Sequence, residues 1–175
     1  MPNRNSRFPR SMFMLLALLG ASITARAAED VVVVLEVFAV QKRDGGEETF
    51  SAAERAMPGD VLEYRATYRN RGNATARKLE ATLPVPAGNI AYIADSARPQ
   101  RVLASLDGQR FEPAPLKRTV KLADGRQQVQ TVPPAEYRFL RWQLGDLAAG
   151  ASTTVVSRMR VDPLPPSRNA QGGQP

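Results

Sequence analysis

Short segments in which apolar and polar residues alternate recur along this chain, and they restrict its fold more than any other feature. Between residues 61 and 69, four apolar side chains alternate with charged or polar ones, and the pattern returns at 140–144 and 155–161. Period two places one set of side chains on one face of a β-strand, whereas a helix would scatter them around its axis. Turn residues separate these segments, which predicts an all-β, antiparallel, immunoglobulin-like β-sandwich.

Individual strands and turns can be placed from the same pattern. The valine-rich run at 30–40 indicates a first strand that is buried on both faces at one end. Residues 51–57 are the one helix candidate after residue 28, with at most two turns. A reversal is expected at 70–73, where Asn and Gly tolerate positive φ. A second reversal is expected at 145–150.

The segment 98–136 stands apart, because it holds two hairpin signals of its own. Asp107-Gly108 and Asp124-Gly125 each lie between short apolar runs, which is typical of a tight β-turn. From the sequence, these two hairpins could pair with either sheet.

The N-terminus has the features of a secretory signal peptide. Three arginines precede an apolar stretch at 12–21, and Ala25-Arg26-Ala27 supplies a small-x-small cleavage pattern before Ala28. The alternative is an uncleaved anchor helix, but the apolar run is shorter than the roughly 20 residues that cross a bilayer. We therefore expect a signal peptide at 1–27, a sandwich domain at 28–162, a disordered tail at 163–175, and a periplasmic or extracellular location without a stable membrane anchor.

Charge gives little support for nucleic-acid binding. The 175-residue chain has 24 Lys and Arg against 17 Asp and Glu. Four basic residues lie within 1–27, so the processed chain would carry 20 against 17, a net charge of +3. No run of five like charges occurs, and no basic stripe is interleaved with aromatic residues.

Four sequence pieces in order resemble the bacterial conserved-repeat domain of cell-surface proteins, also called domain of unknown function eleven. They are Pro-Gly-Asp-Val-Leu-Glu-Tyr at 58–64, Asn-Arg-Gly-Asn at 70–73, Leu-Pro-x-Pro-Ala-Gly at 83–88, and Trp-Gln-Leu-Gly-Asp-Leu-Ala-Ala-Gly at 142–150. The resemblance covers roughly 31–161. It implies an immunoglobulin-like sandwich in an exported or envelope protein, without enzymatic activity.

This chain departs from the family's pattern in two respects. Ala81 stands where the family usually has an acidic residue, two positions before Leu-Pro. The chain also has one copy of the domain, where members often have tandem copies that act as stalks or spacers.

The residue inventory argues against most chemistry. The chain contains no Cys and no His, which removes thiol and imidazole catalysis, disulfides and the common zinc sites. No Ser-x-x-Lys or Gly-x-Ser-x-Gly motif occurs. The carboxylates that could act as a catalytic pair lie in predicted turns, where they more often bind local backbone N–H groups; they are Glu47, Glu48, Asp95, Asp107, Glu112 and Asp124.

Metal and sugar binding have only thin support. The loop at 44–48 could offer oxygen ligands to calcium, but it lacks the D-x-D-x-D-G pattern, and a solvated turn is the favoured interpretation. Trp142 lies on an alternating strand, where an indole is typically a core anchor. Tyr64 and Tyr68 are expected in the core as well. We expect no catalytic, metal-binding or cofactor-binding residue.

The sequence therefore favours a non-enzymatic envelope protein, a single immunoglobulin-like interaction or structural module that contacts a protein partner through an edge strand or a loop. The alternative is a cell-wall or carbohydrate-binding module. That alternative requires exposed aromatic side chains, for which Tyr92, Phe111 and Tyr137 are the candidates.

Overall fold

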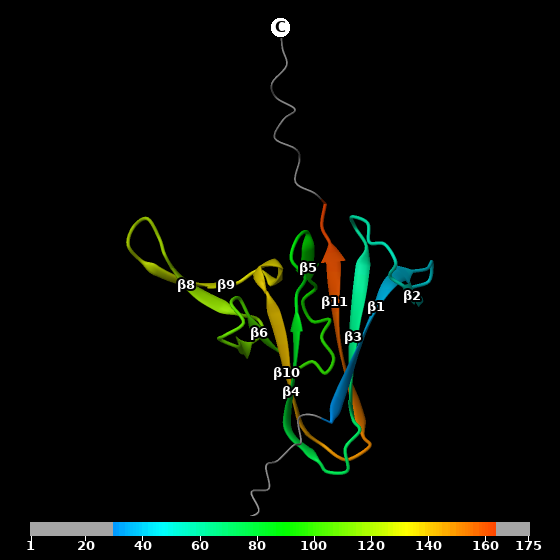
Figure 1. Cartoon of the computed structure of the whole chain (residues 1–175). Helices are drawn as coiled ribbons and strands as arrows, with labels where there is room; N and C mark the ends of the chain where they lie inside the picture. Colours follow the sequence, from blue (N-terminus) through cyan, green and yellow to red (C-terminus); the bar gives the residue numbers. More distant parts are fainter. Residues whose placement is uncertain (1–29, 164–175) are drawn as a thin grey trace, which may run out of the picture.

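Two antiparallel sheets face each other across a shared core in the computed structural model, which describes residues 30–163 (Figure 1). The all-β antiparallel fold predicted from the sequence is confirmed. The larger sheet has the strand order β2 (Glu48–Ala52), β1 (Val31–Lys42), β3 (Val61–Asn70), β11 (Ser152–Val161) and β5 (Ile90–Tyr92). The smaller sheet has the order β4 (Ala76–Pro84), β10 (Phe139–Leu147), β6 (Leu103–Ser105) and β7 (Glu112–Pro113).

The core lies where the alternating segments predicted it. Trp142 on β10 is 1% exposed, and its indole N–H donates to the Pro99 carbonyl oxygen over 2.9 Å. Tyr68 on β3 is buried, and Tyr64 is half-buried against the same cluster. Val155, on β11 of the larger sheet, is fully buried in the same core. The expected core positions of these aromatic residues are confirmed.

The first strand forms, but its expected burial is wrong. The valine run becomes β1, which pairs with β3 along its first ten residues. Val33, Val34 and Leu35 nevertheless remain 48%, 52% and 53% exposed. The reason is that β2 pairs only with the far end of β1, from Phe38 on, and that among residues 31–35 only Val31 packs against the core.

The helix expected at 51–57 is also wrong. Residues 48–52 form β2, and 53–57 follow as bends without a helical turn. Pairing of Phe50 with Val40 fixes this segment as a strand, and tertiary pairing of this kind overrides a helical propensity. In the described part of the chain, helical structure is confined to η1, a 3₁₀ turn at Pro134–Glu136.

The two expected reversals form with different details. Gly72 lies in the first, between β3 and β4, but it does not have a positive φ. A Cβ there would lie 2.6 Å from Asp30 Oδ2, so close approach explains this glycine. The second reversal begins later than expected, because β10 continues past Gly145 to Leu147 with irregular pairing.

Both hairpins expected in 98–136 form. The first consists of β6 and β7 and extends the smaller sheet. The second consists of β8 (Lys117–Lys121) and β9 (Gln127–Thr131), which pair with each other and with neither main sheet. This second hairpin, called the arm below, projects from the body of the molecule (Figure 1).

The chain crosses the larger sheet from one end to the other. Val31 begins β1 opposite Asn70, at one end of β3, and Arg160 near the end of β11 lies opposite Val61, at the other end. The expected signal peptide and most of the expected tail lie outside the described residues. Among residues 30–163, no helix is long and apolar enough to cross a membrane.

Candidate functional site

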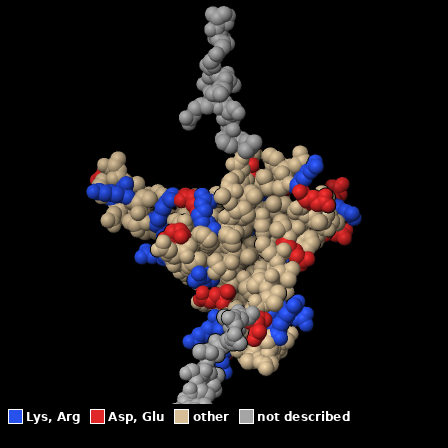
Figure 2. Space-filling view, viewed as in Figure 1, with Lys and Arg blue, Asp and Glu red and all other residues tan. Residues whose placement is uncertain are grey.

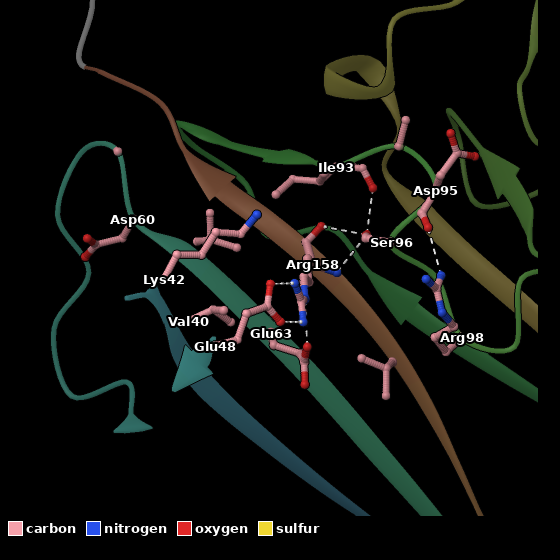
Figure 3. A pocket seen from close by; sticks show the side chains of 14 residues that line it. Val40, Lys42, Glu48, Asp60, Glu63, Ile93, Asp95, Ser96, Arg98 and Arg158 are labelled. Atoms are coloured by element: carbon pink, nitrogen blue, oxygen red, sulfur yellow. Dashed lines mark hydrogen bonds and ion pairs between the residues drawn. The ribbon is translucent and has the colours of Figure 1, made fainter. Parts of the chain in front are cut away.

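A broad hollow lies on the outer face of the larger sheet, the face that points away from the core (Figure 3). It has a volume of about 700 Å³ and is lined by β1, β2, β3, β11 and the segment 93–98. Polar and charged side chains dominate its wall; the labelled ones include Lys42, Glu48, Glu63, Asp95 and Arg158.

Arg158 is at the centre of an ion cluster in this hollow. Its Nη1 and Nη2 donate to the two carboxylate oxygens of Glu48 over 2.8 and 2.7 Å, and its Nε donates to Glu63 Oε2 over 2.7 Å. Arg65 Nε donates to the other oxygen of Glu63 over 2.6 Å. The cluster therefore connects β2, β3 and β11 across the sheet.

Aromatic rings shield part of this cluster from water. The Arg65 guanidinium lies 4.5 Å from the ring centre of Phe38 and 4.7 Å from that of Phe50. These contacts are cation–π interactions. Glu63 is only 4% exposed although it lies on the outer face of a sheet. A buried carboxylate requires paired charges and hydrogen bonds, and Arg65 and Arg158 provide both.

The charges in the cluster stabilise one another. The hydrogen bonds from Arg158 hold the pKa of the Glu48 carboxyl below its ordinary value, and the nearby Lys42 charge adds to this effect. In turn, the bonds to Glu48 raise the pKa of Arg158. Since Arg158, Glu48, Glu63 and Arg65 bind one another, the cluster links the strands and offers no free base or nucleophile.

Of the six carboxylates considered for catalysis, Glu48 and Glu112 lie in strands β2 and β7, so their expected position in turns is wrong, and Glu48 pairs with Arg158. The other four lie in loops and turns. Asp107 Oδ1 accepts from the backbone N–H groups of Gln109 and Arg110, and Asp124 Oδ1 accepts from that of Arg126. These backbone bonds lower the pKa of both aspartates. The expected local role is confirmed for Asp107 and Asp124. Residues 30–163 contain no cluster of three or more acidic side chains placed to hold a metal ion.

The aromatic residues considered for sugar binding are not displayed. Tyr92 is 5% exposed, Tyr137 is 1% exposed, and their rings stack with centres 6.0 Å apart. The Arg141 guanidinium covers the ring of Phe111 at 3.7 Å. The exposure that the carbohydrate-binding alternative requires is not found for the two tyrosines, because both belong to the core.

The arm is almost entirely exposed. Nine of the ten residues in β8 and β9 are exposed, because neither face of this two-stranded sheet is covered by another layer. Val129 is 64% exposed and lies opposite Thr119, between Lys117 and Lys121 on the same face. This face therefore combines an apolar centre with two basic flanks.

The base of the arm is firmly attached to the core. The Leu116 N–H donates to the Tyr137 hydroxyl over 2.9 Å, and the Val132 N–H donates to the Leu116 carbonyl over 2.9 Å. Arg118 forms a two-bond ion pair with Glu136. Isolated two-stranded hairpins are marginally stable, so these contacts hold the arm in a defined orientation.

Positive charge is concentrated in the segment that carries the arm. Residues 98–138 contain eight Lys and Arg against four Asp and Glu, a net charge of +4. The rest of the described chain, 30–97 and 139–163, contains eleven against twelve, a net charge of −1. Figure 2 shows basic side chains gathered along the arm and at its base. The overall sequence charge did not reveal this segregation, although counting charge by segment could have done so.

Comparisons of the chain with protein-family models, with curated proteins and with solved structures found no match.

Proposed function

We propose that this chain is an exported, non-enzymatic envelope protein and that it contacts a protein partner through the arm. The exposed, basic and firmly anchored hairpin β8–β9 carries the proposal. A polar ribbon without a covering layer buries little of its own surface, so both of its faces remain open to contact with another molecule.

The chemistry of the arm favours a partner of a defined kind. Lys117 and Lys121 flank the exposed Val129 on one face. A protein surface with an apolar spot between carboxylates is complementary to this pattern, since charge gives orientation and apolar contact gives affinity. A sugar surface is not favoured, because the described structure buries Tyr92 and Tyr137.

The sequence supports the remaining parts of the proposal. The N-terminal pattern of basic, apolar and small residues favours export. The ordered pieces between 58 and 150 resemble the conserved-repeat domain of cell-surface proteins, and that resemblance favours an immunoglobulin-like module of the envelope. The lack of Cys and His and the closed ion cluster around Arg158 support a non-enzymatic role.

Site-specific crosslinking in the producing cells tests the proposal. A photoreactive residue at position 129 should give one dominant crosslinked envelope protein, and the Lys117→Glu/Lys121→Glu variant should lose it. The matched control is Arg43→Glu/Arg55→Glu, which makes the same charge change on exposed residues away from the arm and should retain the crosslink. Equal capture by both variants, or capture of many unrelated proteins, would contradict a specific contact by the arm.

Export is tested separately on the same cells. The chain recovered from the envelope fraction should begin at Ala28 when its mass is measured. A chain that keeps residues 1–27 and stays in the cytoplasm would refute export without bearing on the arm.

A further inference from the structure

The first half of β1 has one open edge. β3 pairs with one side of β1 at residues 31–40, whereas β2 pairs with the other side only at 38–42. Residues 31–36 therefore have a neighbouring strand on one side and none on the other, within the part of the chain that the structure describes.

The direction of the backbone groups at this edge follows from one hydrogen bond. The Val37 carbonyl accepts from the Ala53 N–H on the β2 side of the strand. Backbone groups of successive residues point to opposite sides of a strand, so residues of the same parity share one side. The N–H and C=O groups of Val31, Val33 and Leu35 therefore point outward along the open edge.

This edge has little of the usual protection against pairing, since Glu36 is the one charged residue within 31–36. Exposed edges commonly carry lysine, proline or a bulge that blocks another strand. Residues 31–36 contain no lysine or proline, and their pairing with β3 is regular. Three successive apolar residues, Val33, Val34 and Leu35, are about half exposed.

We propose that a second copy of this chain pairs with the open edge, antiparallel, through a twofold axis at Val33. In this register Val33 lies opposite Val33 of the second copy, and each Val31 lies opposite a Leu35. All outward N–H and C=O groups of 31, 33 and 35 then form bonds across the axis. The two larger sheets join into one continuous sheet.

The side chains and the length of the open edge favour a second copy of this chain as the strand that pairs with it. A strand seated there must be apolar on both faces, because Val32 and Val34 lie on one face of β1 while Val33 and Leu35 lie on the other. The segment 31–36 meets this requirement. Its length also fits, since Ala53 occupies the position opposite residue 37 and pairing about Val33 keeps 31–36 clear of it.

The charges at the two ends of the pairing are specific to this register. Asp30 lies opposite Glu36 of the second copy, and the two acids are bracketed by Arg71 and Arg65 on the flanking chain segments. These four side chains have a net charge of zero, but the two acids lie next to each other and weaken the pairing. The contact is also narrow, below about 1,000 Å² in total, so the dimer is weak and depends on concentration.

Disulfide trapping tests the register. The chain has no cysteine, and residues directly opposite in a hydrogen-bonded antiparallel pair have Cα atoms about 5.5 Å apart, within the range of a disulfide. Val33→Cys should therefore form a covalent dimer under mild oxidation. Val34→Cys is the matched control, because its exposure is similar but it faces position 32 of the second copy, and it should stay monomeric.

Sedimentation equilibrium tests the contact without a crosslink. The purified processed chain should show a monomer–dimer equilibrium. Val33→Pro removes an outward N–H and should raise the dimer dissociation constant at least about tenfold, whereas Val33→Thr keeps that N–H. Glu36→Arg places a positive charge opposite Asp30 and should lower the dissociation constant roughly threefold. A circular-dichroism spectrum confirms that each variant is folded.

Three results would overturn the proposal. They are a monomer at all concentrations, equal disulfide trapping at positions 33 and 34, and assembly beyond the dimer, because a twofold pair uses up the open edge.

This edge is separate from the arm. Val33→Pro should therefore still crosslink through position 129, and the charge-reversed arm variant should still dimerise, so that failure of one proposal is distinguishable from failure of the other.

Discussion

Arg158 on β11 holds Glu48 on β2 with two parallel hydrogen bonds although β1 and β3 lie between these strands. A flat sheet would separate β2 from β11 by about 14 Å, three strand spacings. The two long side chains therefore reach toward each other across β1 and β3, and the ion pair ties the short edge strand β2 to β11.

We expect this ion pair to make stability depend on pH. The Glu48 carboxyl has an ordinary pKa of 4.5 and a lower pKa in the folded chain, mainly because Arg158 bonds to the charged form. The pair therefore stabilises the fold above about pH 4.5, and this contribution is lost as the pH falls through the folded-state pKa. Glu48→Gln should lower the free energy of unfolding at pH 7, and the difference from wild type should close as the pH falls through the lowered pKa of the folded chain.

Urea unfolding curves between pH 3 and pH 7 provide the measurement. Glu54→Gln, a change at an exposed residue beyond the end of β2, is the control and should match wild type throughout. A constant difference between Glu48→Gln and wild type at all pH values would contradict the pH prediction.

Ser157→Ala should stabilise the protein. Ser157 is fully buried on β11, and its hydroxyl oxygen has no hydrogen-bond partner among the described residues. Removal of an unsatisfied buried hydroxyl should raise the free energy of unfolding by about 0.5–1 kcal/mol. Thermal unfolding measures this change, and a lower melting temperature than wild type would argue that the hydroxyl is bonded in solution.

Gly108 and Gly125 should respond differently to the same substitution. Both have positive φ, at 78° and 85°, but a Cβ on Gly108 would lie 2.8 Å from the Phe139 ring, whereas a Cβ on Gly125 meets nothing within 4 Å. Gly125→Ala should lower the free energy of unfolding by about 1 kcal/mol, from the backbone conformation alone. Gly108→Ala should cost roughly 2 kcal/mol more, from the clash. Equal losses in chemical denaturation would show that the ring moves aside freely.

Tyr137→Phe should loosen the arm more than the core. The substitution leaves the Leu116 N–H without its hydroxyl acceptor, at a cost of about 1–2 kcal/mol for an unpaired buried donor. Hydrogen exchange should therefore accelerate in 116–132 while β3 and β11 keep their protection. Uniform acceleration across all strands would mean that the bond supports global stability and not the orientation of the arm.

The sequence predicted features that depend on local pattern. Trp142 could be placed in the core because alternation along β10 fixes which face an indole occupies. The turns at Gly108 and Gly125 could be placed because Asp-Gly between apolar runs has few other conformations. In these cases, neighbours in the sequence decide the outcome.

Features that depend on distant strands escaped prediction. The valines of β1 indicated burial, but a hydrophobic run does not reveal whether a second layer covers it. Helix-forming residues at 53–56 gave way to the pairing of Phe50 with Val40. Arg158 and Glu48 are 110 residues apart in the sequence, and no local pattern predicts their contact.

The path of the chain through the larger sheet has a mechanical consequence. Because β1 starts at one end of β3 and β11 finishes at the other, tension applied to the two chain ends runs along the strands. β3 spans about 34 Å between those ends. Such a load would shear the β1–β3 and β3–β11 ladders, so that many backbone hydrogen bonds share the force at once.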